Sequence, residues 1–263
     1  MKNKQKIAYY DDERNDDFAG TNIKTQEIGK NFVYEKRNYV WKFFEFIIYY
    51  LIAVPVVWFY MRVILRVKFV NKKALKPYRK TPFFMYGNHT GFIDAFTPNL
   101  ISMPRKNMII TGPDSVSIKG LKNIVQMLGA IPTPSDMKSA KNFVKAIDSA
   151  HKKCNITIYP EAHIWQYYTG VRNFPDTSFS YPLKTNAPCF AFFTAYTKPK
   201  GFLSFLRKAN ITVYISDPIF ATEGNSVSEK KKELRDKIYS FMQECTKYST
   251  YEVIKYVKRP AKA

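Results

Sequence analysis

The chain has 263 residues, which suits one α/β domain with a sizeable core and a small extra segment, and argues against two independent domains. Its 42 Lys and Arg residues against 21 Asp and Glu give a formal net charge of +21 at pH 7. Such a charge indicates an anionic partner (a nucleic acid, an anionic membrane surface or a phosphorylated substrate), unless the lysines are simply spread over solvated faces. The three cysteines have no paired spacing, which argues against a disulfide framework or a zinc site and is typical of a reducing, cytosolic compartment.

Residues 1–42 are polar and mixed in charge, which predicts a mobile or loosely docked N-terminal arm. Residues 43–66 predict a membrane-associated helix, because Phe43 to Met61 is apolar apart from Glu45. As a helix this stretch extends about 28 Å, close to the ~30 Å of a bilayer core, and Pro55 is expected to kink it. Three arrangements fit: a helix partly embedded in one leaflet, a true span, or a buried core helix.

Basic residues flank this segment, and the larger group follows it. The positive-inside tendency therefore predicts that the following domain lies at the cytoplasmic face of the cell membrane. Each Lys or Arg near an anionic leaflet contributes about 1 kcal/mol, so the cluster also predicts a membrane-docking patch and accounts for part of the charge without nucleic acid. The residues are Lys36, Arg37 and Lys42 before the segment, and Arg62, Arg66, Lys68, Lys72, Lys73 and Lys76 after it.

Residues 67–263 predict a single domain in which strands alternate with helices. Short apolar or β-branched runs predict the strands, and apolar residues recurring every three or four positions predict the helices. We expect an α/β fold with a mixed sheet of five to seven strands flanked by helices. Gly129 is expected to end one helix and Ser135 to cap the next. The predicted strands are 83–86, 107–111, 155–159, 188–196 and 211–216, and the predicted helices begin near Asp94, Ser117, Ser135 and Ser228.

The stretch 87–94 follows the first of these strands and sets a histidine and an aspartate five residues apart. Side chains just beyond the carboxyl end of such a strand can point into a crevice, the usual ligand position in open α/β folds. A neutral imidazole can take a proton from a hydroxyl, and a carboxylate on its other nitrogen fixes the tautomer. No Ser or Cys nucleophile follows at a matching distance, so His89 and Asp94 predict direct transfer onto an acceptor alcohol. The alternative is a turn histidine bonded to a nearby carbonyl.

The segment Asn88-His89-Thr90-Gly91-Phe92-Ile93-Asp94 resembles the N-H-x-S-x-x-D signature of the glycerolipid acyltransferases, the family of 1-acylglycerol-3-phosphate and lysophospholipid acyltransferases, with Gly91 at the usual serine. Tyr159-Pro160-Glu161-Ala162-His163 resembles the family's F-P-E-G-T-R block but lacks its Gly-Thr-Arg. Leu128-Gly129-Ala130-Ile131 and Ala187-Pro188-Cys189-Phe190 stand where the family has its Gly-x-Ile block and its late Val-Pro strand. The resemblance runs from about residue 67 to 218.

This resemblance implies that His89, oriented by Asp94, deprotonates the hydroxyl of a lysolipid such as 1-acylglycerol-3-phosphate. The hydroxyl then attacks the thioester of acyl-CoA or acyl carrier protein, and no cofactor is required. Backbone N–H groups after His89 or before Ala130 are expected to stabilise the oxyanion. The family's phosphate-binding arginines are missing from both blocks, and this puts the phosphate-bearing acceptor in doubt. The substrate-binding residues that we expect are Glu161, Gly129 and His163, with Lys138 and Arg172 as substitute charges.

Other interpretations remain open. Glu161 could be a turn glutamate bonded to backbone amides, and His89, Asp94, Glu161 and His163 could form the ligand set of a metal hydrolase, although we expect no metal. A nucleic-acid binder fits the charge but leaves the apolar helix unexplained, so we expect no nucleic acid. A related acyltransferase acting on a non-phosphatidic lysolipid or another alcohol, and a catalytically inactive membrane adaptor, also fit. His151, at a helix end beside two lysines, is expected at the surface.

Overall fold

The computed structural model describes residues 6–20, 23–36, 38–201 and 204–260. Within this part, seven strands form one sheet in the order β2-β8-β7-β3-β6-β4-β5. All neighbours in it run parallel except β7 and β8, so the expected mixed sheet of five to seven strands is confirmed. These strands are β2 (Lys68–Val70), β3 (Phe84–Gly87), β4 (Asn107–Thr111), β5 (Ala130–Pro132), β6 (Asn155–Ile158), β7 (Cys189–Thr197) and β8 (Asn210–Ile215).

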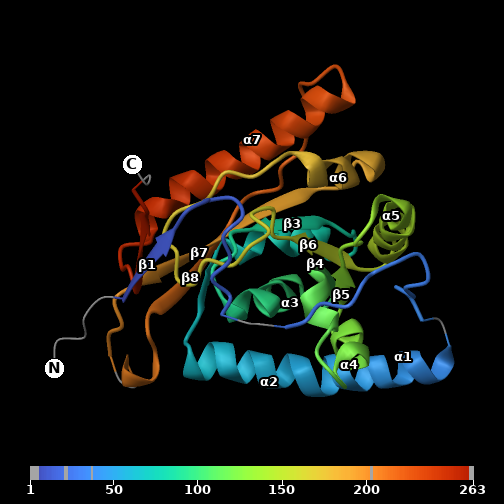
Figure 1. Cartoon of the computed structure of the whole chain (residues 1–263), viewed down its shortest axis with the longest axis horizontal. Coiled ribbons are helices and arrows are strands. Elements are labelled where there is room, and N and C mark those ends of the chain that lie inside the picture. The colour runs from blue at the N-terminus through green and yellow to red at the C-terminus, as the bar shows by residue number, and fades with distance from the viewer. Residues whose placement is uncertain (1–5, 21–22, 37, 202–203, 261–263) are drawn as a thin grey trace.

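Two apolar clusters cover the two faces of the sheet, because side chains alternate along each buried strand. Phe84 and Tyr86 of β3 belong to the cluster under α5, α6 and α7, whereas Met85 of β3 and Phe83, just before the strand, belong to the cluster on the opposite face. Figure 1 shows α5, α6 and α7 on one side of the sheet, and α3 and the long apolar helix on the other. These helices are α3 (Thr97–Ser102), α5 (Met137–His151), α6 (Ser180–Thr185) and α7 (Val227–Cys245).

Two helix starts differ from the sequence-based expectation. The helix expected from Ser117 begins only at Lys122, as α4 (Lys122–Met127), because Gly120 takes a left-handed turn at φ +79°. Asp136, not Ser135, caps α5: its carboxylate accepts the Ser139 amide at 2.8 Å. The Ser135 hydroxyl instead accepts the amide of Ile28, from the N-terminal segment.

The described residues of the N-terminal segment pack against the domain, in contrast with the mobile or loosely docked arm expected for 1–42. The strand β1 (Lys6–Tyr10) pairs in parallel with β9 (Ile254–Lys258), near the other end of the chain. Further along, Ile28 is fully buried, and the indole of Trp165 donates to the carbonyl of Asp16 at 2.8 Å. The division of the chain at residues 42 and 66 stays a prediction, and Arg37 of the basic flank lies outside the described residues.

A continuous helix from Tyr39 to Ile64 is long and apolar enough to cross a membrane. It comprises α1 (Tyr39–Phe46), a π-helical stretch (Ile47–Ala53), α2 (Val54–Phe59) and a second π-helical stretch (Tyr60–Ile64). Pro55 lies in the first turn of α2, where its missing N–H is tolerated. The helix lies along one side of the domain, beside α3 and α4 (Figure 1).

One face of this helix is tied to the domain and the other is open. The Tyr49 hydroxyl donates to the Asn99 side chain at 2.7 Å and accepts the Asn107 amide at 3.1 Å. Glu45, the acidic residue of the segment, pairs with Lys106. The helix is therefore neither a buried core helix nor separate from the domain. Its exposed large apolar side chains are Tyr39, Val40, Phe43, Phe44, Phe46, Leu51, Ile52, Val56, Trp58, Phe59, Tyr60 and Val63.

Candidate active site

The predicted catalytic turn begins where β3 ends, and two residues fix its path. At Gly87 any Cβ would overlap the ring of Phe192 on the neighbouring strand β7, so only glycine fits. At Asn88 the side chain accepts the Thr194 amide at 2.8 Å and donates to the Thr194 carbonyl at 3.2 Å. The buried Asn88 thus extends the pairing of β3 and β7 by one residue, and it delivers His89 at the carboxyl end of the sheet.

His89 and Asp94 are in contact in the structure. The imidazole Nδ1 lies 3.0 Å from Asp94 Oδ2, and the same oxygen accepts the amides of Thr90 at 2.6 Å and Gly91 at 2.9 Å. Asp94 is fully buried, whereas the His89 side chain keeps 18 % of its surface exposed. A carboxylate can only accept here, so in the neutral imidazole the proton is on Nδ1 and Nε2 is unprotonated, which is the form that a general base requires.

Tyr159, the residue after β6, holds the imidazole from its face. The two rings are stacked, with centroids 4.4 Å apart and planes 17° apart. The Tyr159 hydroxyl also donates to the backbone carbonyl of Asp94, so the same side chain braces both members of the pair. The sequence reading missed this role, although Tyr159 stands at the start of a motif that it singled out.

A second tyrosine supports the turn from β7. The hydroxyl of Tyr196 lies 2.8 Å from that of Thr90, and both residues are buried. Tyr167 follows on the 159–168 loop, where its amide donates to the Thr90 carbonyl at 2.8 Å. Tyr159, Tyr196 and the backbone of Tyr167 therefore all contact the turn and limit the movement of His89.

The predicted oxyanion donors are engaged elsewhere. The amides of Thr90 and Gly91, the first two after His89, both donate to Asp94. The amide of Gly129, before Ala130, donates to the Gln126 carbonyl at 3.0 Å. These three amides can therefore bind an oxyanion only by giving up the contacts that they make in this structure.

Glu161 is buried and paired with Arg172. The Arg172 Nε lies 3.0 Å from Glu161 Oε2, and its other nitrogens donate to the carbonyls of His163 and Glu13. Burial raises the pKa of Glu161, because the cost of desolvating its charge exceeds the stabilisation that Arg172 provides. The guanidinium is only 1 % exposed, so in this structure Arg172 holds the 159–168 loop and is closed to a phosphate from solvent.

The other predicted binding residues lie apart from His89. Gly129 is the residue before β5. The next residue, Ala130, lies in the same row of the sheet as Ile109 of β4 and Met85 of β3, and this row is short of the carboxyl end where His89 lies. Lys138 is exposed in the first turn of α5. His163 is partly exposed, with Nδ1 3.9 Å from a carboxylate oxygen of Asp17. The structure thus brings together His89 and Asp94, and it does not gather the remaining residues around them.

The metal-ligand set considered for His89, Asp94, Glu161 and His163 does not form. Glu161 is engaged with Arg172, and His163 faces Asp17. Across residues 6–20, 23–36, 38–201 and 204–260, no group of three or more His, Cys, Asp or Glu residues is placed to hold a metal ion.

His151, expected at the surface, is buried instead. It is 7 % exposed, and its ring packs on Phe84 with centroids 4.3 Å apart. Burial lowers the pKa of His151 to about 4, so the side chain is neutral at physiological pH. It belongs to the packing between α5 and β3, far from the reacting end of the sheet.

The candidate site and the apolar helix share one apolar cluster. Ile93 and Tyr159 from the site pack in the same cluster as Met61 from the helix. The turn at His89 continues into α3, which lies against α2. Phe92, on this connection, is 75 % exposed. His89 therefore lies close to an apolar surface.

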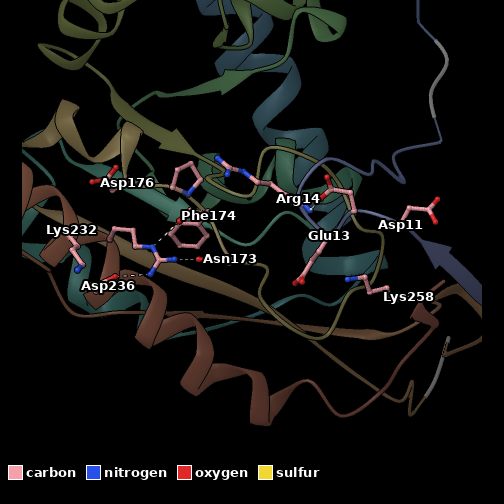
Figure 2. Close-up of a pocket in the computed structure, with 12 residues that line it drawn as sticks. Asp11, Glu13, Arg14, Asn173, Phe174, Asp176, Lys232, Asp236 and Lys258 are labelled. Carbon is pink, nitrogen blue, oxygen red and sulfur yellow. Dashed lines mark hydrogen bonds and ion pairs between the residues drawn. The ribbon is translucent and has the colours of Figure 1, made fainter. Parts of the chain in front are cut away.

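A pocket of about 720 Å³ lies elsewhere. Figure 2 shows it between the N-terminal segment, with Asp11, Glu13 and Lys258 nearby, and the start of α7, with Lys232 and Asp236. Its charges are mixed, and Arg235 pairs with Asp236. His89 and Asp94 are not among its lining residues.

Comparison with known proteins gives a partial likeness of fold. No protein-family model matches the sequence, and no curated protein matches it. Among solved structures, the chain is similar to the 1-acyl-sn-glycerophosphate acyltransferase from Thermotoga maritima, with 16 % identity and a TM-score of 0.48. The match covers 68 % of this chain and 71 % of the other. A likeness of this size carries no statement about function.

Proposed function

We propose that this chain is an acyltransferase that works at a membrane and uses His89 as general base. The observation that carries the proposal is the pair itself: a buried aspartate fixes Nδ1 of a partly exposed histidine and leaves Nε2 to act. Among the described residues, no Ser or Cys side chain is bonded to this histidine, which favours direct transfer to an acceptor hydroxyl over a covalent intermediate.

The reaction follows from this arrangement. Nε2 of His89 takes the proton of the acceptor hydroxyl, and the oxygen forms a bond with the thioester carbonyl carbon of acyl-CoA or acyl carrier protein. Asp94 stabilises the imidazolium that results. When the tetrahedral intermediate collapses, the carbon–sulfur bond breaks and the imidazolium returns its proton to the departing thiolate. The products are an ester and a free thiol, and no cofactor takes part.

The acceptor that we propose is a glycerolipid with a free hydroxyl, such as 1-acylglycerol-3-phosphate. The apolar helix and the exposed Phe92 support a lipid substrate, because they give the site an apolar approach. The exposed face of the helix and the basic residues after it support a location at the cytoplasmic face of the cell membrane. Arg172 is not free to bind the phosphate, so a lysolipid without a phosphomonoester, or another alcohol, is the second candidate acceptor.

The test is free-thiol release from acyl-CoA, and separately from acyl carrier protein, by the detergent-solubilised protein with a panel of lysophospholipids and alcohols. We expect release that depends on the acceptor and falls by about 100-fold or more in His89→Ala, the scale of general-base catalysis. The acceptor that supports release names the substrate class.

The control variant is His163→Ala, which removes the same side chain from a partly exposed position beside Asp17. It should keep most of the release if His163 is outside the site. Release that survives in His89→Ala refutes the proposed base. No release with any donor or acceptor favours a catalytically inactive membrane adaptor.

A further inference from the structure

A second site lies at the opposite end of β3 from His89. A pocket of about 200 Å³ opens between the end of α3 and the 3-10 helix that follows β2, which spans Lys72–Tyr78. Phe83, the residue before β3, forms part of its wall, six residues before His89, so that the two sites are roughly 20 Å apart along the strand direction. The pocket is therefore separate from the catalytic turn.

The lining of this pocket is strongly basic. Half of the ten lining residues are cations, and none of the ten is Asp or Glu. The remaining residues are apolar or small, and Leu75, Phe83 and Ile101 connect the floor to the apolar cluster that also contains Met61. The cations are Lys72, Lys73, Lys76, Arg79 and Arg105.

The cations at this pocket are held close to one another. The Arg105 guanidinium donates to the carbonyls of Lys153 at 2.8 Å and Arg79 at 3.4 Å, while its buried Nε has no partner among the described residues. Lys72 donates to the Leu100 carbonyl. Partial burial lowers the pKa of Lys72, and the positive charges of Arg62 and Arg79 lower it further. An anion in the pocket would relieve this repulsion.

The same wall of the pocket contacts the apolar helix. Met103 and Arg105 line the pocket, and the carbonyl of Pro104 between them accepts from the hydroxyl of Tyr50 on the helix at 3.4 Å. The next residue, Lys106, pairs with Glu45 of the helix. The pocket therefore lies beside the helix whose outer face is apolar. A helix lying in a bilayer surface would place these cations at the level of the lipid headgroups.

We propose that this pocket binds the phosphate of one anionic phospholipid of the membrane on which the apolar helix lies. A volume of about 200 Å³ is below the 300–1,000 Å³ of typical ligand pockets, and so it suits a headgroup better than a nucleotide or a whole acyl donor. The apolar floor belongs to the cluster that also packs under the helix, so the pocket lies next to the surface that we expect to meet the bilayer. This site acts in membrane binding and does not depend on the acyl-transfer reaction.

The test measures vesicle binding by cosedimentation, without acyl donor. One vesicle type contains phosphatidylcholine with phosphatidylglycerol, and a second contains phosphatidylcholine with oleic acid at the same zeta potential. The variant Lys76→Gln with Arg79→Gln removes two cations of the pocket. The matched control, Lys230→Gln with Lys232→Gln, removes two cations from α7, on the other face of the sheet (Figure 1).

We expect the pocket variant to bind phosphatidylglycerol vesicles about 30-fold more weakly. Each cation near the leaflet raises the binding constant about five-fold, and the variant lacks two of them. The α7 variant should bind these vesicles less than about 3-fold more weakly than the parent protein. On oleate vesicles, the difference in binding between the two variants should be much smaller. Circular dichroism and thermal unfolding show whether both variants are folded.

Three results would overturn the proposal. Equal losses in the two variants would mean that only diffuse charge acts. Equal losses on phosphate and oleate vesicles would remove phosphate recognition. Thermal stabilisation of the parent protein by millimolar inorganic phosphate, lost in the pocket variant while vesicle binding is unchanged, would assign the pocket to soluble phosphate.

Discussion

The substitution Asp94→Asn tests the catalytic pair most directly, because it keeps the shape of the side chain and removes its charge. If the asparagine oxygen takes the place of Oδ2, it can still accept from His89, Thr90 and Gly91. Its NH2 group then takes the place of Oδ1, a buried atom that has no hydrogen-bond partner among the described residues. The variant therefore loses a charge and gains a buried donor without an acceptor.

Both effects have a calculable size. At an effective dielectric constant of 20, an imidazolium and a carboxylate at 3.0 Å attract each other by about 5 kcal/mol. The amide dipole recovers part of this attraction, which leaves about 3–4 kcal/mol of lost transition-state stabilisation, or a decrease in kcat of about 10²–10³-fold. The unsatisfied donor costs a further ~1–3 kcal/mol of folding stability. KM should change little, because Asp94 is buried behind His89.

The assay is acceptor-dependent thiol release, with kcat expressed per folded molecule after urea unfolding has fixed the folded fraction. Asp136→Asn is the matched control, since it makes the same chemical change at the N-cap of α5. A kcat for Asp94→Asn within about 3-fold of the parent value, while His89→Ala is inactive, would show that Asp94 only shapes the turn.

Three further substitutions test the packing of the domain. His151→Phe should flatten the pH dependence of unfolding: because the folded pKa is about 4 against 6.5 unfolded, the neutral histidine contributes fully above pH 6.5, and up to about 3 kcal/mol is lost as the pH falls to 4. Ala162→Gly should raise the free energy of unfolding by about 1 kcal/mol, since Ala162 has φ +64°; Ala146→Gly inside α5 should lower it by a similar amount. Arg172→Met should cost about 3–5 kcal/mol in urea unfolding, and adding Glu161→Gln should recover part of that loss if the buried pair is the cause.

The strands could be predicted because their signal is local. Residues 107–111 form a run bounded by polar residues, and β4 has those same limits. The helix expected from Ser117 starts later in the structure. The apolar spacing continues through Gly120, but the positive φ of this glycine turns the chain before α4 begins. Apolar spacing records which side chains face inward, and a turn can satisfy it as well as a helix does.

Contacts between distant segments could not be predicted from the sequence in this way. Ser135 and Asp136 are both good capping residues, and the choice between them depends on Ile28, more than a hundred residues earlier. The pairing of β1 with β9 joins the two ends of the chain, and it shows no sign in either segment alone. The role of Tyr159 is of the same kind, because its ring meets His89 only after β3 and β6 lie side by side.

The contacts of the apolar helix bear on how it can meet a membrane. A helix that spanned the bilayer would be surrounded by lipid and by other spanning segments, where an unpaired Glu45 is costly. Here Glu45 pairs with Lys106, and Tyr49 bonds with Asn99 and Asn107, along the face toward the domain. Spanning would break these contacts and leave polar groups in hydrocarbon, whereas lying in the interface keeps them and immerses only the exposed face. In that orientation the cations beside Pro104 and the turn at His89 lie along the same side of the sheet. Lipid bound at one end of β3 would then hold His89, the proposed general base at the other end, close to the bilayer.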